Sequence, residues 1–571
     1  MDIQRLVLFI VFSMSVLFLW EGWQKEQRPA VTAAATATTT TADAAKGAAA
    51  LPQDATPIPG EKLASGQPDK SAPAVSVLPV EAVGKLATGE KILVKTDTVM
   101  AEIDTAGGDL RRLELLQHPD KEDKSKPYAL LQNEAGRAYI AQSGLIGEGL
   151  PSHKTQYTAV GALQYQLAPG QDKIEVRLLA PETAGTNVRV SKIYTFHRGS
   201  YVVDVGFEIT NQGTTAIQPF SYFQMLRDSK PVSGSIFMVQ SYTGAAVYTD
   251  QDKFKKVDFP SLDKDKAIYP KNADNGWIAM LEHYFLTAWL PKDKTPREYY
   301  AKRLGEHEYS AGVIVPTGVI EPGKTVSVSM PLYAGPQEQR ALSALAPGLD
   351  LTVDYGWLTI IGAPLFWLLS LFHSWVGNWG AAIILLTVLI KALFFPLSAA
   401  SYRSMAKMRV IAPKLQRLRE QHGDDRQRMH QAMMEMYKTE KINPMGGCLP
   451  ILVQIPVFIS LYWVLLASVE LRYAPFVLWI HDLSAPDPYY VLPIIMGITM
   501  IIQTKLNPTP PDPIQAKVMQ IMPIAFSIFF FFFPAGLVLY WLVNNTLSIA
   551  QQWQITRMIE STTAIAASKK K

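Results

Sequence analysis

The residues with the clearest chemical potential lie in apolar segments of the C-terminal half of the chain. Lys391 lies inside the apolar run 379–397, and Thr387 lies one helical turn before it, on the same face of a helix. A charge inside a membrane span is costly and is usually kept for function, but a lysine near the end of a span can also extend its amine to the membrane surface. On residue type alone, both interpretations of Lys391 remain open.

A stripe of polar residues marks the last apolar segment. Its members recur at steps of four, four and three, which places them on one helical face: Tyr540, Asn544, Ser548 and Gln551. Gln454 is a further polar residue inside an apolar segment. Because lipid cannot satisfy polar groups, such side chains face the protein interior or water. Hydrogen bonding between helices explains Gln454 or Thr387 singly, but it explains an unpaired lysine poorly, so the set predicts a wet, positively charged pocket.

Several kinds of chemistry have no support in the sequence. It has no GxxxxGK[ST] nucleotide loop, no HExxH motif and no GxSxG nucleophile elbow, and its single cysteine, Cys448, excludes an internal disulfide and CxxC motifs. His197, Glu282 and His283 have no spacing that supports catalysis. We therefore expect no enzyme, no cofactor and no bound metal. A positive pocket that does no chemistry suits a ligand that is negative and apolar.

The composition indicates a membrane protein with a large polar insert. Of the 571 residues, 48% are apolar and 18% are charged, and 54 basic residues against 50 acidic ones do not suggest a nucleic-acid binder. The apolar run 3–20 predicts an N-terminal membrane anchor, residues 1–24, with a cleaved signal peptide as the alternative. Residues 25–87 are rich in Ala, Thr and Pro, which predicts a disordered tether.

Residues 88–340 have the pattern of a soluble β domain. Along 201–211, four apolar residues alternate with polar or small ones: Val203, Val205, Phe207 and Ile209. This period of two gives a strand one buried face and one wet face. Turn signals follow other strand-like runs, so we expect one large all-β sandwich.

The charge pattern sets the predicted topology. Segment 398–445 carries ten Lys and Arg against five acidic residues, so it should be cytoplasmic, and its periodicity predicts a helical hairpin. With the β domain outside, 341–378 is an interfacial helix and 379–397 crosses the membrane. The fold class is therefore mixed: the β domain and a polytopic α-helical core, 379–560, with six transmembrane helices including the anchor. The later spans are 446–468, 490–506, 519–533 and 537–553, both termini are cytoplasmic, and 561–571 is a basic tail.

Three motifs in the C-terminal half resemble the YidC family of membrane protein insertases. They are NPMGGCLP at 443–450, running on to QIPVF at 454–458, MAKMR at 405–409, and FPAGLVLYW at 533–541. The anchor, tether and β domain are similar to the layout of Gram-negative members with a large periplasmic domain. The resemblance implies that this domain is a β-supersandwich similar to mutarotase-like folds, and that the protein lies in the bacterial inner membrane.

The resemblance also implies the function and its residues. A protein of this family inserts nascent inner-membrane proteins and assists their folding, alone or beside the Sec translocon, through a hydrophilic groove that holds one positive residue. That residue corresponds to Lys391, where Gram-negative members commonly have arginine, so a mechanism that needs only the charge is retained. Implied substrate-contacting residues are Ile455, Pro456 and Phe530, and membrane lipid is a further implied partner. The hairpin and basic tail resemble the region that recruits the ribosome and the signal-recognition-particle receptor.

Two other functions remain open at this point. Lys391 could serve as the binding charge of a small-anion transporter or channel, which uptake into sealed vesicles would reveal. The β domain could belong to an envelope enzyme that acts on glycans, but only analogy of fold supports this. The insertase is the function that we expect.

Overall fold

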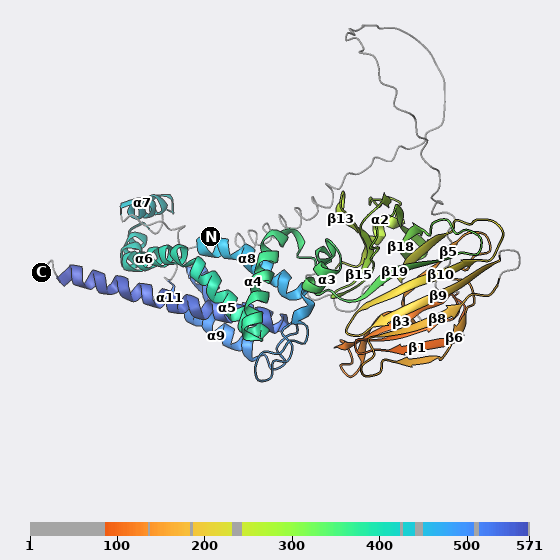
Figure 1. The fold of residues 1–571 in the computed structure, drawn as a ribbon. Helices are drawn as coiled ribbons and strands as arrows, with labels where there is room; N and C mark the ends of the chain where they lie inside the picture. The colour runs from red at the N-terminus through yellow and green to blue at the C-terminus, as the bar shows by residue number, and fades with distance from the viewer. Residues whose placement is uncertain are drawn as a thin grey trace, which may run out of the picture. The chain divides into compact units, whose positions relative to one another are not determined.

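The computed structural model describes residues 86–134, 137–182, 187–230, 242–422, 426–439, 449–507 and 513–568 (Figure 1). The predicted anchor, the tether up to residue 85, the motif residues 443–448 and the last three residues of the basic tail lie outside these ranges. The chain divides into two compact units, and the larger one comprises residues 72–508 and 520–571. Everything described below lies in this larger unit, except the first residues of helix α10.

The strands form two sheets. The ten-stranded sheet has the spatial order β14 (Asn272–Ala273), β17 (Arg297–Gly305), β18 (Glu308–Pro316), β11 (Phe220–Asp228), β5 (Arg137–Ile146), β4 (Pro127–Glu134), β3 (Asp109–Pro119), β2 (Val99–Asp104), β1 (Lys91–Lys95), β7 (Gln164–Gln166). The nine-stranded sheet has the order β13 (Lys253–Val257), β12 (Gly244–Thr249), β15 (Trp277–Leu281), β16 (Phe285–Trp289), β19 (Thr325–Pro336), β10 (Val202–Asn211), β9 (Val188–His197), β8 (Lys173–Leu179), β6 (Thr158–Val160). Among the described strands, only β1 and β7 pair in parallel.

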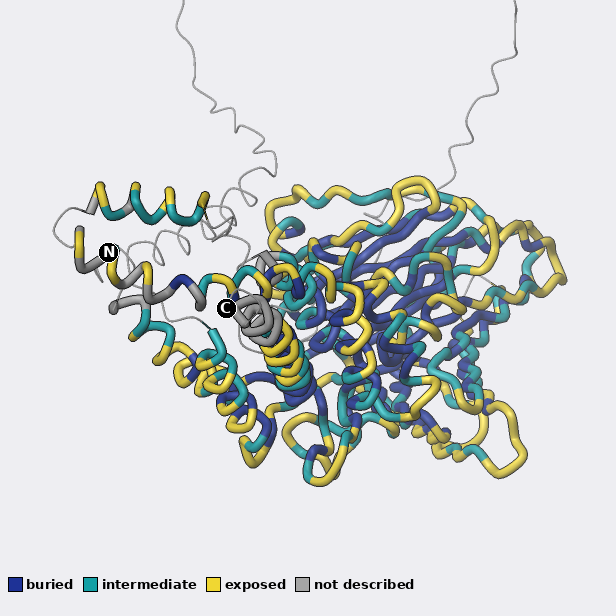
Figure 2. Tube along the Cα trace, turned by 90° about the vertical axis from the view of Figure 1, so that its left-hand side faces the viewer, coloured by how far each residue is buried: buried dark blue, intermediate teal, exposed yellow. Residues whose placement is uncertain are grey.

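The alternation that predicts a strand at 201–211 is confirmed in β10. Val203, Val205, Phe207 and Ile209 are buried, and β10 pairs with β9 on one side and with β19 on the other. Apolar side chains of both sheets join one hydrophobic cluster. Figure 2 shows the strands largely in the colour of buried residues. The predicted β sandwich is therefore confirmed.

The helices follow the sandwich, apart from the short α2 (Phe259–Asp263) within it. They are α3 (Gln339–Leu345), η3 (Leu349–Thr352), η4 (Gly356–Leu358), α4 (Thr359–Val376), α5 (Trp379–Leu393), α6 (Phe395–His422), α7 (Arg426–Thr439), α8 (Leu449–Ala467), η6 (Val469–Leu471), α9 (Val491–Leu506), α10 (Pro513–Phe529), η7 (Phe530–Phe532) and α11 (Ala535–Ser568). Helix α11 contacts α5, α6, α8 and α9, while α4 packs against α5 and α8. An apolar cluster joins α4, α5, α8, α9 and α11.

The predicted span 379–397 is not one helix, which is a correction. Helix α5 ends at Leu393, and α6 begins at Phe395 after a bend of 66°. Pro396 explains the break, because it has no backbone N–H to donate to the carbonyl of Ala392 and so cannot continue the hydrogen bonds of α5. The sequence pattern of apolar residues runs through this bend, so periodicity alone did not reveal it.

Few described helices meet a simple criterion of length and hydropathy for crossing a membrane. One helix does, Gly356–Val376, and a second candidate is the bent pair Trp379–Leu393 and Phe395–Met408. The first of these covers the segment that the sequence assigns to the outer interface. Helices α8, α9 and α10 contain shorter apolar stretches. The six-span topology and the interfacial position of 341–378 stay predictions.

The predicted helical hairpin has the expected helices. Helices α6 (Phe395–His422) and α7 (Arg426–Thr439) pack against each other. Met429, Met433 and Met436 are partly buried on α7, as one apolar stripe of that helix requires.

Candidate functional site

The candidate site begins at Lys391, which α5 buries to 7% exposure. Its Nζ donates a hydrogen bond to Ser548 Oγ of α11 at 2.6 Å. The Ser548 hydroxyl donates in turn to the carbonyl of Asn544 at 2.8 Å. Among the described residues, no carboxylate forms an ion pair with Lys391. The cation therefore has only neutral partners in this part of the structure.

Polar side chains of α8 and α11 extend the site. Gln454 Nε2 donates to Asn544 Oδ1 at 2.5 Å and lies 3.4 Å from Tyr540 Oη. Lys391, Ser548, Asn544, Gln454 and Tyr540 thus form one connected chain of hydrogen bonds across three helices. The structure brings together five of the seven polar residues that the sequence assigns to a pocket, and Gln551 makes no hydrogen bond with them.

Thr387 is the other predicted residue that does not join this chain. It is fully buried on α5, and its hydroxyl donates to the carbonyl of Ile383 at 2.7 Å. This is the ordinary hydrogen bond of a threonine within a helix, so Thr387 offers no donor to a ligand.

Several polar atoms farther along α11 are buried and make no hydrogen bond with other described residues. They are Asn545 Nδ2, Gln551 Oε1 and Gln552 Oε1. Buried polar atoms are normally satisfied by protein or by water, so these three atoms add to the polar character of α11 near the stripe.

The structure adds residues from the start of α6 that sequence reasoning missed. Ser398, Ser401 and Tyr402 are buried there, and Tyr402 packs in one cluster with Ile555 of α11, the helix that carries Ser548. Their spacing of three and four is a signal of one helical face. It was missed because the basic charge of 398–445 assigned this whole segment to the cytoplasmic hairpin.

The predicted substrate-contacting residues differ in exposure. Ile455 on α8 is 45% exposed and Pro456 is partly buried. Phe530 in η7 is only 2% exposed and packs against Phe533 and Trp541, with ring centroids at 5.2 and 5.4 Å. In this conformation Ile455 can meet a substrate, whereas Phe530 would have to be uncovered first.

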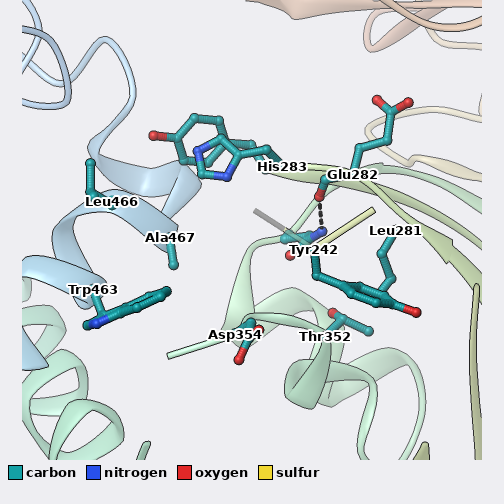
Figure 3. Close-up of a pocket in the computed structure, with 11 residues that line it drawn as sticks. Tyr242, Leu281, Glu282, His283, Thr352, Asp354, Trp463, Leu466 and Ala467 are labelled. Carbon is teal, nitrogen blue, oxygen red and sulfur yellow. Dashed lines mark hydrogen bonds between the residues drawn. The ribbon is translucent and has the colours of Figure 1, made fainter. Parts of the chain in front are cut away.

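Glu282 and His283 of the β domain are adjacent in sequence, but their side chains do not point toward one another. The carboxylate of Glu282 accepts hydrogen bonds from Tyr128 Oη at 2.7 Å and Arg137 at 3.2 Å, and it pairs with Arg227 at 2.7 Å. Figure 3 shows the imidazole of His283 on the side of Leu466 and Ala467, with the Glu282 carboxylate turned away from it.

His197 lies on another strand, where its Nε2 is 2.7 Å from Asp204. Burial lowers the pKa of His283 to about 4, so it is neutral near pH 7. Among the described residues, no group of three or more His, Cys, Asp or Glu could hold a metal ion.

The fold combines a large β sandwich with a group of apolar helices. Residues 91–368 match the family model of the YidC periplasmic domain, and residues 371–562 match that of the 60Kd inner membrane protein. The chain is 70% identical to membrane protein insertase YidC of Nitrosospira multiformis over the whole of both chains. It is 62% identical to the same insertase of Nitrosomonas eutropha, covering 98% of this chain and 90% of that one.

The chain belongs to the YidC family and is a membrane protein insertase, which confirms the resemblance seen in its motifs. The family places it in the bacterial inner membrane with its β domain in the periplasm.

Solved structures resemble the chain more distantly. A crystal structure of an active YidC insertase with its first transmembrane domain resolved is 19% identical, covers 83% of this chain and 95% of that one, and has a TM-score of 0.40. A galactose mutarotase related enzyme from Lactobacillus acidophilus is 8% identical, covers 43% of this chain and 97% of that one, and has a TM-score of 0.28. Both TM-scores are low, and neither likeness bears on function.

Proposed function

We propose that the polar chain around Lys391 lines a hydrophilic groove in which this insertase receives polar segments of nascent inner-membrane proteins. The observation that carries the proposal is the buried amine with only neutral partners among the described residues. A buried cation without a carboxylate is costly, and an incoming acidic side chain would lower that cost by supplying the missing charge. Lys391 would therefore attract the acidic, polar end of a substrate.

The apolar part of the substrate would leave sideways into lipid. Ile455 and Pro456 on α8 lie on its route, and Phe530 would join them once α10 and η7 move. Burial of a Leu or Phe side chain contributes about 1.5–3 kcal/mol, so a few such residues offset the transfer of a short polar tail. No nucleotide is needed for this step.

The proposal includes the predicted topology and partners. Six spans with both termini in the cytoplasm place the hairpin α6–α7 and the basic tail where a ribosome and the signal-recognition-particle receptor could dock. The Sec translocon would hand over substrates that the protein does not insert alone. Support for this comes from the charge of segment 398–445, which is basic as a cytoplasmic loop requires.

Insertion of a small coat-protein-like substrate into liposomes that contain only this protein tests the groove. We expect the wild type and Lys391→Arg to insert the substrate, and Lys391→Ala and Lys391→Glu to fail. Lys407→Glu, which changes an exposed lysine of α6, is the matched control and should insert normally. If all variants insert equally, Lys391 is only a membrane anchor and the groove proposal is wrong. Uptake of a small anion that depends on Lys391 would favour the transporter instead.

A further inference from the structure

A cavity of about 680 Å³ lies between the β sandwich and the loops that follow α8 and η7. Its β-domain wall consists of residues 120–124 after β3, strand β4 and the hairpin 283–285 between β15 and β16. Its other wall consists of 472–473, 482–486 and the turn at 532–534. Pro534 of this turn forms a bridge with Pro486. The cavity therefore adjoins the junction of η7 and α11, on the same side of the helical core as the periplasmic domain.

The guanidinium of Arg472 lines this cavity, and only part of its hydrogen-bonding capacity is satisfied. Its Nη2 donates to the carbonyl of Pro119 at 2.8 Å, while its buried Nη1 makes no hydrogen bond with other described residues. Aromatic rings surround the guanidinium, with centroids 4.9–5.9 Å away: Tyr128, Tyr284, Phe285 and Tyr473. A guanidinium that is surrounded by rings and has one nitrogen without a partner is a preorganised donor for an oxyanion.

Two tyrosines of the cavity wall have unusual backbone conformations. Tyr284 has a φ of +71° and Tyr473 a φ of +57°. Bulky residues rarely adopt this left-handed region, and such strain gathers at binding sites, where the surrounding structure holds it in place. Nε2 of His283, on the same wall, is likewise buried without a hydrogen bond to any described residue.

Four basic side chains line the cavity, Lys121, Lys124, Arg137 and Arg472, against three acidic ones, Asp120, Glu122 and Asp482. Arg137 is paired with Glu282 of the β domain, and two of the carboxylates also stabilise their own loops. Asp120 accepts hydrogen bonds from the backbone N–H groups of Glu122 and Asp123. Asp482 accepts two from Ser484. In contrast, Lys121 and Lys124 are exposed at the rim, and Lys124 Nζ lies 5.2 Å from the ring centroid of Tyr473.

We propose that this cavity, the periplasmic cleft, binds acidic residues of a substrate segment that has just crossed the membrane. This inference rests on the proposed function and extends it to the other side of the bilayer. Translocated segments are poor in Lys and Arg, which stay in the cytoplasm, so their remaining charges are mainly acidic. Arg472, Lys121 and Lys124 would hold an Asp or Glu side chain, and the aromatic rings would contact its apolar neighbours.

Photo-crosslinking in liposomes with the full-length protein tests the periplasmic cleft. The probe is a single-span protein whose translocated tail carries two Asp residues beside a photoreactive side chain, compared with the same protein carrying two Asn residues. The variants are Arg472→Gln and the double variant Lys121→Gln with Lys124→Gln. Arg189→Gln, which changes an exposed arginine of β9, is the matched control.

We expect the Asp tail to crosslink to segments 120–124 and 472–473. Both cleft variants and the Asn tail should lower this yield several-fold, and the control should not. The lysine variants change only exposed side chains, so they remain informative if Arg472→Gln loosens the contact with the β domain. If insertion is normal but both tails, or all variants, give equal crosslinking yields, the proposal for the periplasmic cleft is wrong. The proposal for the Lys391 groove would not be affected by this result.

Lipid composition separates a peptide from a phospholipid as the occupant. Crosslinking that follows the content of anionic phosphatidylglycerol, rather than the charge of the tail, would show a lipid phosphate in the cleft and would contradict our proposal. A wild type that inserts neither tail would contradict the proposed function itself, which the Lys391 variants test separately.

Discussion

Two buried lysines, one in each part of the protein, have opposite surroundings. Lys192 of β9 is fully buried in the sandwich, where its Nζ donates to the carbonyls of Gly107 and Ser143 at 3.1 and 3.0 Å and lies 4.0 Å from Asp109 Oδ1. Lys391 of α5 is almost as deeply buried, but its amine donates only to Ser548 among the described residues. The charge of Lys192 is compensated within its own domain, whereas the charge of Lys391 has no acidic partner among the described residues.

The surroundings of a buried charge indicate whether it stabilises the fold or binds a substrate. Burial lowers the pKa of Lys192 and raises the pKa of Asp109, while their mutual attraction opposes both shifts. Rings of Tyr157, Tyr194 and Phe207 surround the same amine at 5.7–5.8 Å. Such complete coordination is expected where a charge only holds a fold together. Its absence around Lys391 supports a role in binding substrate.

The largest expected effect comes from Lys391→Met. The change removes the charge that we propose contacts the substrate, and a charged hydrogen bond is worth about 1.5–3 kcal/mol, so we expect insertion to fall about 10- to 100-fold. The thermal stability of the protein should not fall, because only a hydroxyl loses its partner. Insertion into liposomes and thermal unfolding in detergent measure the two effects. If Lys391→Met unfolds at a lower temperature than the wild type but inserts substrate normally, Lys391 has a structural role rather than a role in binding substrate.

Lys192→Met should have the opposite outcome. It removes one of the two cations that lie 4.0 Å from the buried Asp109 carboxylate, the other being Arg111, and breaking a buried pair costs up to about 3–5 kcal/mol. Urea unfolding, followed by the fluorescence of the β domain, would show this loss of stability. Insertion by the fraction that remains folded should be unchanged. If stability is unaffected, Lys192 is not the structural counterpart that we describe.

Glu470 of η6 adds a third buried ionisable group to the two lysines. Its hydrogen bonds are too few to offset the cost of burying its charged form. Its Oε1 accepts a hydrogen bond from the backbone N–H of Gln339 at 3.3 Å, its Oε2 has no partner among the described residues, and burial raises its pKa to about 7.

The folded state therefore favours protonated Glu470. This stabilisation is present below pH 4.5 and is lost as the pH rises through 7, with a total of about 3 kcal/mol. Thermal unfolding at pH 5, 6, 7 and 8 should show the decline. Glu470→Gln should flatten the curve, and a curve that is the same in the variant would disprove the assignment.

Asn544→Leu should have the smallest effect. It removes the acceptor of Gln454 in the polar chain, and hydrogen bonds between membrane helices are worth about 0.6–2 kcal/mol, so we expect insertion to fall about 3- to 30-fold. Thr546→Leu, on an exposed position of the same helix, is the matched control. If Asn544→Leu inserts substrate at the same rate as the control, Asn544 and Gln454 do not contribute to the groove, and only Lys391 and Ser548 remain as its proposed polar residues.

The sequence alone determined the features that repeat with a local period. The alternation of β10 and the polar stripe from Tyr540 to Ser548 both follow from spacing, because a strand repeats every two residues and a helix about every 3.6. The three family motifs were equally visible. Lys391 was identified as a candidate before any contact was known, since a charge in an apolar run is rare in itself.

The tertiary structure decided which residues meet across long stretches of chain. Lys391 and Ser548 are separated by 157 positions, and Arg472 and Pro119 by 353, so no local period relates them. Packing also buried Phe530 and brought Tyr402 of α6 against Ile555 of α11. Periodicity gives the face of an element, but the partner of that face depends on how distant segments fold together.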